Sequence, residues 1–346
     1  MLTLSRDPRK KDTKLIDVFS KSQKRRRTPI NTVYFTHDQS EDRQNQAPAT
    51  GVLALHRTML KKANKISGAN LDEICRMIDE DEEPDQGDPL RPAYWNVLEV
   101  YERALKREMY LGDQDDTFFR LDLPTNKTDW PGTFTLIGNS GAGKTYFLVE
   151  MIIRYLKAVH RHRTRPILWF SPEWEIDKTL APLKHPRHSL YVIGTDIGHQ
   201  AVKKSGMDAA SYFQTKVHHV LEKHGEGAIV VFDDFRDAHS AMVPMLRKAY
   251  NTMLRTARHR NSSVIQLAHT YAGGKLTSQA LQSNKYVIFF PRSQRNRCIR
   301  FCTDHLMMSV QDAKEMVQRF ASLDRSMIIQ MHSPVAIMCS KYITLV

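Results

Sequence analysis

The sequence feature that most constrains this chain is the octapeptide GNSGAGKT at residues 138–145. It matches the phosphate-loop pattern G-x-x-x-x-G-K-[ST] at every fixed position. A short apolar segment, Thr133–Ile137, precedes it, and a stretch with apolar residues along one side, Lys144–His160, follows it. A strand, a glycine-rich loop and a helix form the context in which this pattern binds phosphate. The octapeptide therefore predicts a nucleotide-binding core of alternating strands and helices.

The positions of this loop have separate predicted roles. The glycines let the backbone turn tightly, so that inward-pointing N–H groups and the N-terminus of the next helix can cradle phosphate oxygens. Lys144 is expected to reach the β- and γ-phosphates, and the Thr145 hydroxyl is expected to ligate Mg²⁺. We therefore expect ATP and Mg²⁺ to bind at the loop residues Gly138, Asn139, Ser140, Gly141, Ala142, Gly143, Lys144 and Thr145.

Composition narrows the class of protein. The chain has 346 residues, 41% hydrophobic and 26% charged, as in a globular protein with one or two sizeable cores. No apolar run approaches the roughly 20 residues of a membrane span, and no signal-peptide core is present, so a protein that is not secreted is expected. The net charge of +13 favours a polyanionic partner. The 4 cysteines do not complete a zinc-binding set, which favours free thiols.

Three regions follow one another along the chain. Residues 1–50 are polar and basic and lack sustained apolar periodicity, so we expect them to be disordered. Their cluster KSQKRRR, Lys21–Arg27, fits a nuclear address, a nucleic-acid tether or a solvated charge run. Residues 51–125 have helical spacing and predict a small accessory region. Residues 126–346 alternate apolar strands with helices, which predicts an α/β core with a mostly parallel sheet.

A second motif, GAIVVFDDF at Gly227–Phe235, is an apolar strand that ends in two aspartates. A carboxylate at the end of this strand can complete the Mg²⁺ shell opposite Thr145, and we assign that role to Asp233. Asp234 can then orient or deprotonate the attacking water. The alternative is that one aspartate only caps the following helix.

The next predicted strand, NSSVIQLAHTY, carries polar residues toward its end. Gln266 or His269 could contact the γ-phosphate and report its loss, or either could cap a loop. Hydrolysis also needs positive charge where the γ-phosphate leaves. Arg258, in the cluster ARHR before this strand, is our first candidate for an arginine finger that reaches a neighbouring subunit, and Arg295, in the cluster PRSQRNR, is the second. Both clusters could instead contact nucleic-acid phosphates or lie in solvent.

GNSGAGKT, the apolar strand ending in DD, and RHRNSSVIQLAH together resemble the packaging ATPases of large DNA viruses. The resemblance is to the poxvirus-type group in the FtsK–HerA branch of the RecA-like ATPases, and it covers about residues 130–335. It implies a RecA-like P-loop core in a hexameric ring that pumps double-stranded DNA into a capsid. Capsid proteins would be partners, and the virion or the host cytoplasm or nucleus the location.

The resemblance also implies roles for single residues, namely ATP–Mg²⁺ binding by Lys144 and Thr145, metal binding by Asp233, a base role for Asp234 and a sensor role for Gln266. Many relatives carry Glu where this chain has Asp234.

Three other functions remain open at this point. The chain after the loop is long enough for one RecA-like core, which also fits a ring-shaped replicative helicase or another DNA translocase. A nucleotide-metabolising kinase would use PRSQRNR as a phosphate-clamping lid. A nucleic-acid-binding scaffold would carry a vestigial ATP site, and the intact Lys144, Thr145 and Asp233 argue against it.

Overall fold

The structure is a computed structural model. It describes residues 2–5, 13–20, 29, 31–35, 49–111, 117–125, 130–159, 165–172, 177–184, 189–195, 200–235, 238–270 and 283–346. The chain divides into two compact units. Unit 1 comprises Met1–Arg120, Lys314–Asp324 and Pro334–Val346, and unit 2 comprises Leu121–Ala313 and Arg325–Ser333. The sequence predicted one continuous core over residues 126–346. The structure differs, because two C-terminal segments of that range belong to unit 1.

Unit 2 is built on a mostly parallel sheet with the strand order β12-β11-β6-β10-β9-β7-β8. The strands are β6 (Thr133–Ile137), β7 (Ile167–Ser171), β8 (Leu190–Gly194), β9 (Ile229–Asp233), β10 (Ser263–Ala268), β11 (Tyr286–Phe289) and β12 (Met327–Gln330). Only β12 runs antiparallel to its neighbour β11 in this set. The predicted α/β core with a mostly parallel sheet is confirmed.

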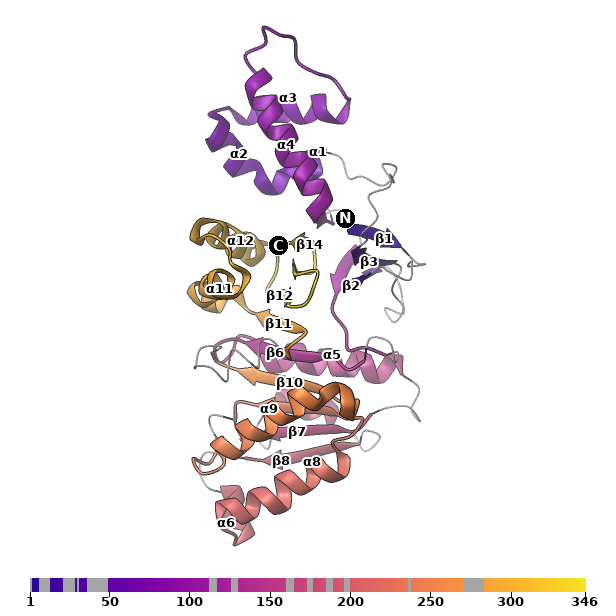
Figure 1. Ribbon diagram of the computed structural model, residues 1–346, viewed down its shortest axis with the longest axis vertical. Helices are drawn as coiled ribbons and strands as arrows, with labels where there is room; N and C mark the ends of the chain where they lie inside the picture. Colours follow the sequence, from indigo (N-terminus) through magenta and orange to yellow (C-terminus); the bar gives the residue numbers. More distant parts are fainter. Residues whose placement is uncertain are drawn as a thin grey trace. The chain divides into compact units, whose positions relative to one another are not determined.

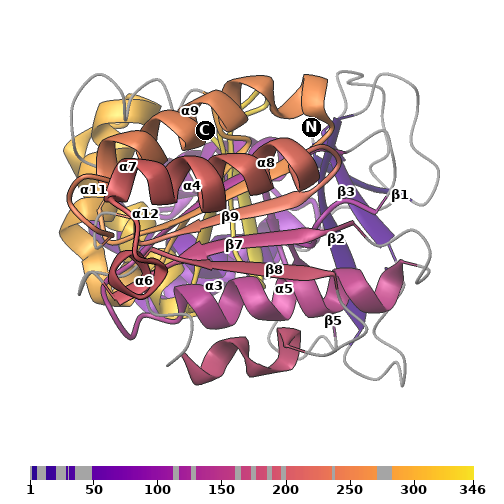
Figure 2. The same ribbon diagram turned by 90° about the horizontal axis from the view of Figure 1, so that it is seen from below.

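Helices cover both faces of this sheet. They are α5 (Lys144–Ala158), η4 (Lys178–Leu183), α6 (Gln200–Ser205), α7 (Ala209–Tyr212), η5 (Phe213–His218), α8 (His219–His224), α9 (Val243–Arg260) and α11 (Pro291–Leu306). Figure 2 shows α5 on one face and α8 and α9 on the other. Every residue of β6, β7 and β9 is buried, as expected for apolar strands covered on both faces. Phe170 and Phe232 stack in the core beneath α9, with ring centroids 5.2 Å apart.

Helix α11 was not expected, because its first residues were interpreted only as the basic cluster PRSQRNR. Pro291 begins the helix, a position where its fixed φ suits helical geometry. Cys298, Phe301 and Cys302 supply a buried stripe at helical spacing. Gln294 interrupts the first turns with φ −143° and ψ 42°, so the helix is kinked there.

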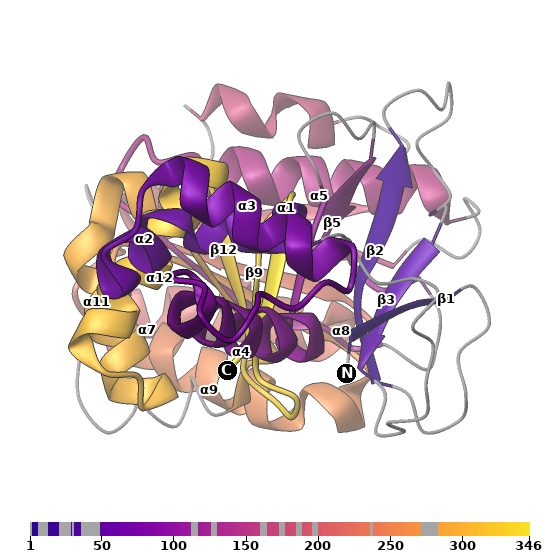
Figure 3. The ribbon, with the colours of Figure 1, turned by 90° about the horizontal axis from the view of Figure 1, so that it is seen from above.

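Unit 1 contains a group of helices, which covers the predicted helical region of residues 51–125 only as far as Arg107. They are α1 (Ala49–Leu53), η2 (Ala54–His56), α2 (Arg57–Asn64), α3 (Gly68–Asp79) and α4 (Arg91–Arg107), with the part of α12 (Val310–Leu323) that begins at Lys314. Figure 3 shows α3 and α4 lying close to α1 and α2. Leu60, Ile74 and Val97 are buried in their shared core. Strand β4 (Glu108–Tyr110) pairs with β14 (Tyr342–Leu345), which forms an antiparallel hairpin with β13 (Ala336–Met338).

The expected disorder of residues 1–50 is wrong for the part that the structure describes. Strands β1 (Leu2–Ser5), β2 (Thr13–Ser20) and β3 (Asn31–Phe35) form an antiparallel sheet with β5 (Thr117–Arg120) in the order β1-β3-β2-β5 (Figure 1). Its apolar side chains, Leu15, Ile16, Val18, Phe19 and Val33, are buried. Strand β5 comes from nearly a hundred residues downstream of β2, a pairing that local composition cannot reveal. The basic cluster Lys21–Arg27 lies outside the described residues.

No helix within the described ranges combines the length and the apolar character that crossing a membrane requires.

Candidate active site

The phosphate loop joins the end of β6 to the start of α5 at the carboxyl edge of the sheet, where ligands bind in open α/β folds. Gly141 (φ +74°) and Gly143 (φ +101°) adopt left-handed conformations that favour glycine. A Cβ on Gly143 would lie only 2.7 Å from Nη2 of Arg325, whereas one on Gly141 would meet open space. Both glycines therefore allow a tight loop whose backbone faces the ligand.

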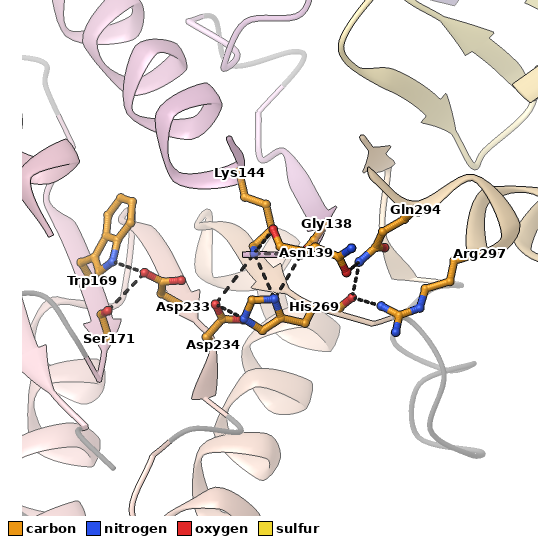
Figure 4. Close-up of polar contacts among 10 residues, drawn as sticks. All are labelled: Gly138, Asn139, Lys144, Trp169, Ser171, Asp233, Asp234, His269, Gln294 and Arg297. Carbon is orange, nitrogen blue, oxygen red and sulfur yellow. Dashed lines mark hydrogen bonds and ion pairs between the residues drawn. The ribbon is translucent and has the colours of Figure 1, made fainter. Parts of the chain in front are cut away.

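Lys144 lies in the first turn of α5 and is 6% exposed. Its Nζ donates hydrogen bonds to the carbonyl oxygens of Gly138 (2.9 Å) and Asn139 (3.4 Å). Nζ also lies 3.4 Å from Nδ1 of His269 and 3.9 Å from Oδ2 of Asp234 (Figure 4). The ammonium group is therefore held between the loop and the ends of two neighbouring strands.

Asp233 ends strand β9 and is 7% exposed. Its Oδ2 accepts hydrogen bonds from Trp169 Nε1 (3.3 Å) and Ser171 Oγ (3.2 Å), both on the adjacent strand β7 (Figure 4). Burial, followed by the charge of Asp234, raises the pKa of the Asp233 carboxyl to about 7. A bound cation would favour the ionised form of such a carboxyl, which suits a metal ligand.

Asp234 has a left-handed backbone, with φ +34°, and its N–H donates to the carbonyl oxygen of Leu267 at 3.2 Å. Its Oδ2 lies 3.0 Å from Nε2 of His269. His269 Nδ1 in turn lies 3.2 Å from the Gly138 carbonyl oxygen. A neutral imidazole protonated at Nε2 would donate to Asp234 and accept from Lys144, whereas an imidazolium would donate to both Asp234 and Gly138. In either form His269 connects the acidic pair to the phosphate loop.

These side chains line one cavity of about 560 Å³, a volume suited to a nucleotide. Its lining comprises Asn139, Ser140, Gly141, Gly143, Lys144, Thr145, Tyr146, Ser171, Pro172, Asp177, Thr179, Asp233, Asp234 and His269. Thr145 and Asp233 offer the oxygen ligands that Mg²⁺ prefers. Among the described residues there is no group of three or more His, Cys, Asp or Glu side chains arranged to hold a metal ion.

Gln266, expected as the sensor, does not line this cavity. It lies within β10, three residues before His269, and is aligned with Thr135 and Phe232 on the neighbouring strands. Those two residues contact Tyr250 of α9, so Gln266 shares the sheet face that α9 covers. The structure instead brings His269 to the phosphate loop.

Neither arginine candidate lines the cavity. Arg258 lies near the end of α9, which leads into the amino end of β10 and so lies at the edge opposite the phosphate loop. Arg295 lies on α11, whose Ser293 carbonyl oxygen accepts a hydrogen bond from Asn139 Nδ2 at 2.9 Å. Only the second candidate therefore lies at the edge of the sheet that carries the loop.

Sequence reasoning missed three residues that hold the site together. Ser171 supports Asp233, while Gln294 and Arg297 both donate to the carbonyl oxygen of His269, at 2.9 and 2.7 Å. The sequence did contain a signal for Ser171, because this serine ends the apolar strand PILWFS. Gln294 and Arg297 have no local signal, because their partners lie more than 20 residues away in the sequence.

No curated protein matches the sequence. The genome packaging NTPase B204 from Sulfolobus turreted icosahedral virus 2, in complex with ATP-gammaS, is 14% identical, with 62% of this chain and 98% of that chain covered and a TM-score of 0.37. The cytoplasmic domain of the Thermomonospora curvata type VII secretion ATPase EccC is 10% identical, with 69% and 28% covered and a TM-score of 0.40.

At the level of families, the profile described as "Poxvirus A32 protein" matches residues 124–329, which include the loop, the acidic pair and His269. Since this match spans more than half of the chain, the protein belongs to the poxvirus A32 family.

Proposed function

We propose that this chain is the ATPase of a viral DNA-packaging motor, which couples ATP hydrolysis to the translocation of double-stranded DNA into capsids. The observation that carries this proposal is the convergence of Lys144, Asp233, Asp234 and His269 on one cavity at the carboxyl edge of the sheet. Membership of the poxvirus A32 family and the net charge of +13 support a viral, DNA-directed role.

Each side chain has a defined part in the proposed reaction. The loop N–H groups and Lys144 bind the phosphates, and Thr145 and Asp233 would hold Mg²⁺. When bound, this ion would neutralise phosphate charge. Asp234 orients the attacking water and accepts its proton, while the contact with His269 Nε2 at 3.0 Å fixes the carboxylate.

We assign the sensor role to His269 instead of Gln266. His269 lies within 3.4 Å of Lys144, within 3.0 Å of Asp234 and within 3.2 Å of the Gly138 carbonyl oxygen. When Lys144 turns from the loop carbonyls toward a γ-phosphate, one of these contacts changes. The imidazole is therefore placed to respond to the presence of that phosphate.

In a ring of identical subunits, a neighbouring copy could supply a further charged group to the proposed ATP site. Among the described residues that line the cavity, Lys144 and His269 are the basic side chains. A further cation from a neighbouring copy would stabilise the charge that develops on the leaving phosphate. We therefore propose a homo-oligomeric ring, hexameric as in the resemblance, with Arg258 or Arg295 acting across the subunit interface. Double-stranded DNA and capsid proteins are its proposed partners, in the virion or the host cell.

A DNA-stimulated ATPase assay tests this function. We expect the wild-type chain to hydrolyse ATP faster with double-stranded DNA, and we expect Lys144→Ala to show no hydrolysis. Phosphoryl transfer to a small acceptor without stimulation by DNA would instead indicate a kinase. Separation of the strands of a forked substrate would indicate a helicase.

A further inference from the structure

The first turns of α11 contact two separate parts of the proposed ATP site. Gln294 Nε2 donates to Asn139 Oδ1 in the phosphate loop at 2.5 Å and to the His269 carbonyl oxygen at 2.9 Å (Figure 4). One side-chain amide thus joins the loop to the segment that follows β10. Both partners of this amide line the cavity.

Asn139 and the His269 carbonyl oxygen each make a second hydrogen bond with the same helix. Asn139 Nδ2 donates to the Ser293 carbonyl oxygen at 2.9 Å, so the Asn139 amide is held at both its oxygen and its nitrogen. Arg297 Nη1 donates to the His269 carbonyl oxygen at 2.7 Å. The start of α11 therefore fixes Asn139 and His269 relative to each other.

The conformation of Gln294 is costly. The side chain is 5% exposed, and its Oε1 has no hydrogen-bond partner within the described part of the chain. A buried acceptor without a partner is unfavourable, because it has lost its hydrogen bonds to water. The residue also departs from helical geometry inside α11. A glutamine held in this way at the edge of a ligand cavity points to a role for its amide donor.

We propose that Gln294 is a positioning residue, which couples the conformation of the phosphate loop at Asn139 to the position of His269. This inference depends on the proposed ATPase function. Because His269 contacts Lys144 and Asp234, a shift of the loop on nucleotide binding would be passed to both catalytic side chains through Gln294. Loss of the amide donor would let the loop and His269 move independently.

The test compares Gln294→Met, Asn139→Ala and the double variant with Asn296→Ala, an exposed control on the same helix. Methionine keeps the length of the side chain and removes the donor. We measure the Kd for ATPγS separately from kcat and KM for ATP hydrolysis, together with the thermal midpoint. The loss of one well-made hydrogen bond corresponds to about a tenfold change.

We expect Gln294→Met and Asn139→Ala each to weaken ATPγS binding about tenfold, and the double variant to be no weaker than the worse single variant. The control should match the wild type. Effects that multiply in the double variant would overturn the coupling, and so would a Gln294→Met protein with wild-type Kd and kcat. If Gln294→Met does not fold, Asn139→Ala still decides, because Asn139 is exposed and wild-type binding by that variant would refute the proposal. A wild-type chain that binds no ATPγS would refute the proposed function itself.

Discussion

Replacing each left-handed glycine of the phosphate loop with alanine tests the loop geometry directly. Gly141→Ala adds a Cβ that meets open space, so its cost is the left-handed backbone alone, about 1–2 kcal/mol. Gly143→Ala carries the same strain, and its Cβ would lie 2.7 Å from Arg325 Nη2. The guanidinium group must then leave the Ala142 carbonyl oxygen, to which it donates at 3.2 Å, and losing that bond adds about 1 kcal/mol.

The assay is thermal unfolding without nucleotide, on both variants and in an Arg325→Ala background. For a unit of this size each kcal/mol lowers the midpoint by about 2–4 °C. We therefore expect Gly141→Ala to unfold about 3–6 °C below the wild type and Gly143→Ala about 3 °C lower still. In the Arg325→Ala background the difference between the two glycine variants should disappear, because the displaced side chain is already gone.

Two results would refute this reasoning. If the difference between the glycine variants persists in the Arg325→Ala background, the close approach of Arg325 is not its cause. If both glycine variants are as stable as the wild type, the loop does not adopt the left-handed conformations at Gly141 and Gly143.

Three further predictions concern the chemistry. Asp234→Asn should retain ATP binding and lower kcat by about 10²–10⁴-fold, because an amide cannot accept the proton of the attacking water. Asp233→Asn should also weaken Mg²⁺-dependent nucleotide binding. Equal effects of the two variants on nucleotide affinity would contradict this division of roles. His269→Ala should lower kcat by about 10–100-fold, because the contacts with Asp234 and Lys144 are lost. Unchanged turnover would show that His269 is not the sensor. Mixed Arg258→Ala and Lys144→Ala proteins, each inactive alone, should regain part of the DNA-stimulated activity. Arg295→Ala is mixed with Lys144→Ala in the same way, and regained hydrolysis with either arginine variant would establish a shared site. Full activity of both arginine variants alone would argue against it.

Local sequence signals were sufficient wherever one segment carries both the element and its chemistry. The phosphate loop lies between β6 and α5, and the two aspartates end β9, as their flanking apolar runs predicted. Family membership, predicted from these motifs and from RHRNSSVIQLAH, is confirmed by the profile match. These features depend on residues within about ten positions of one another, so hydrophobic periodicity and glycine placement are enough to reveal them.

Contacts between residues that are distant in the sequence could be found only in the three-dimensional structure. Gln266 lies within β10 and His269 directly follows that strand. The strand register shows that Gln266 shares the face covered by α9, and the side-chain contacts show that His269 reaches Lys144. Gln294 contacts Asn139 across 155 positions of sequence. A nucleotide-binding α/β core and its acidic pair could be predicted from the sequence alone, because one local segment contains all the residues that each motif needs. The side chains that surround the site could be identified only from the fold, because these contacts join segments that are far apart in the sequence and adjacent in space.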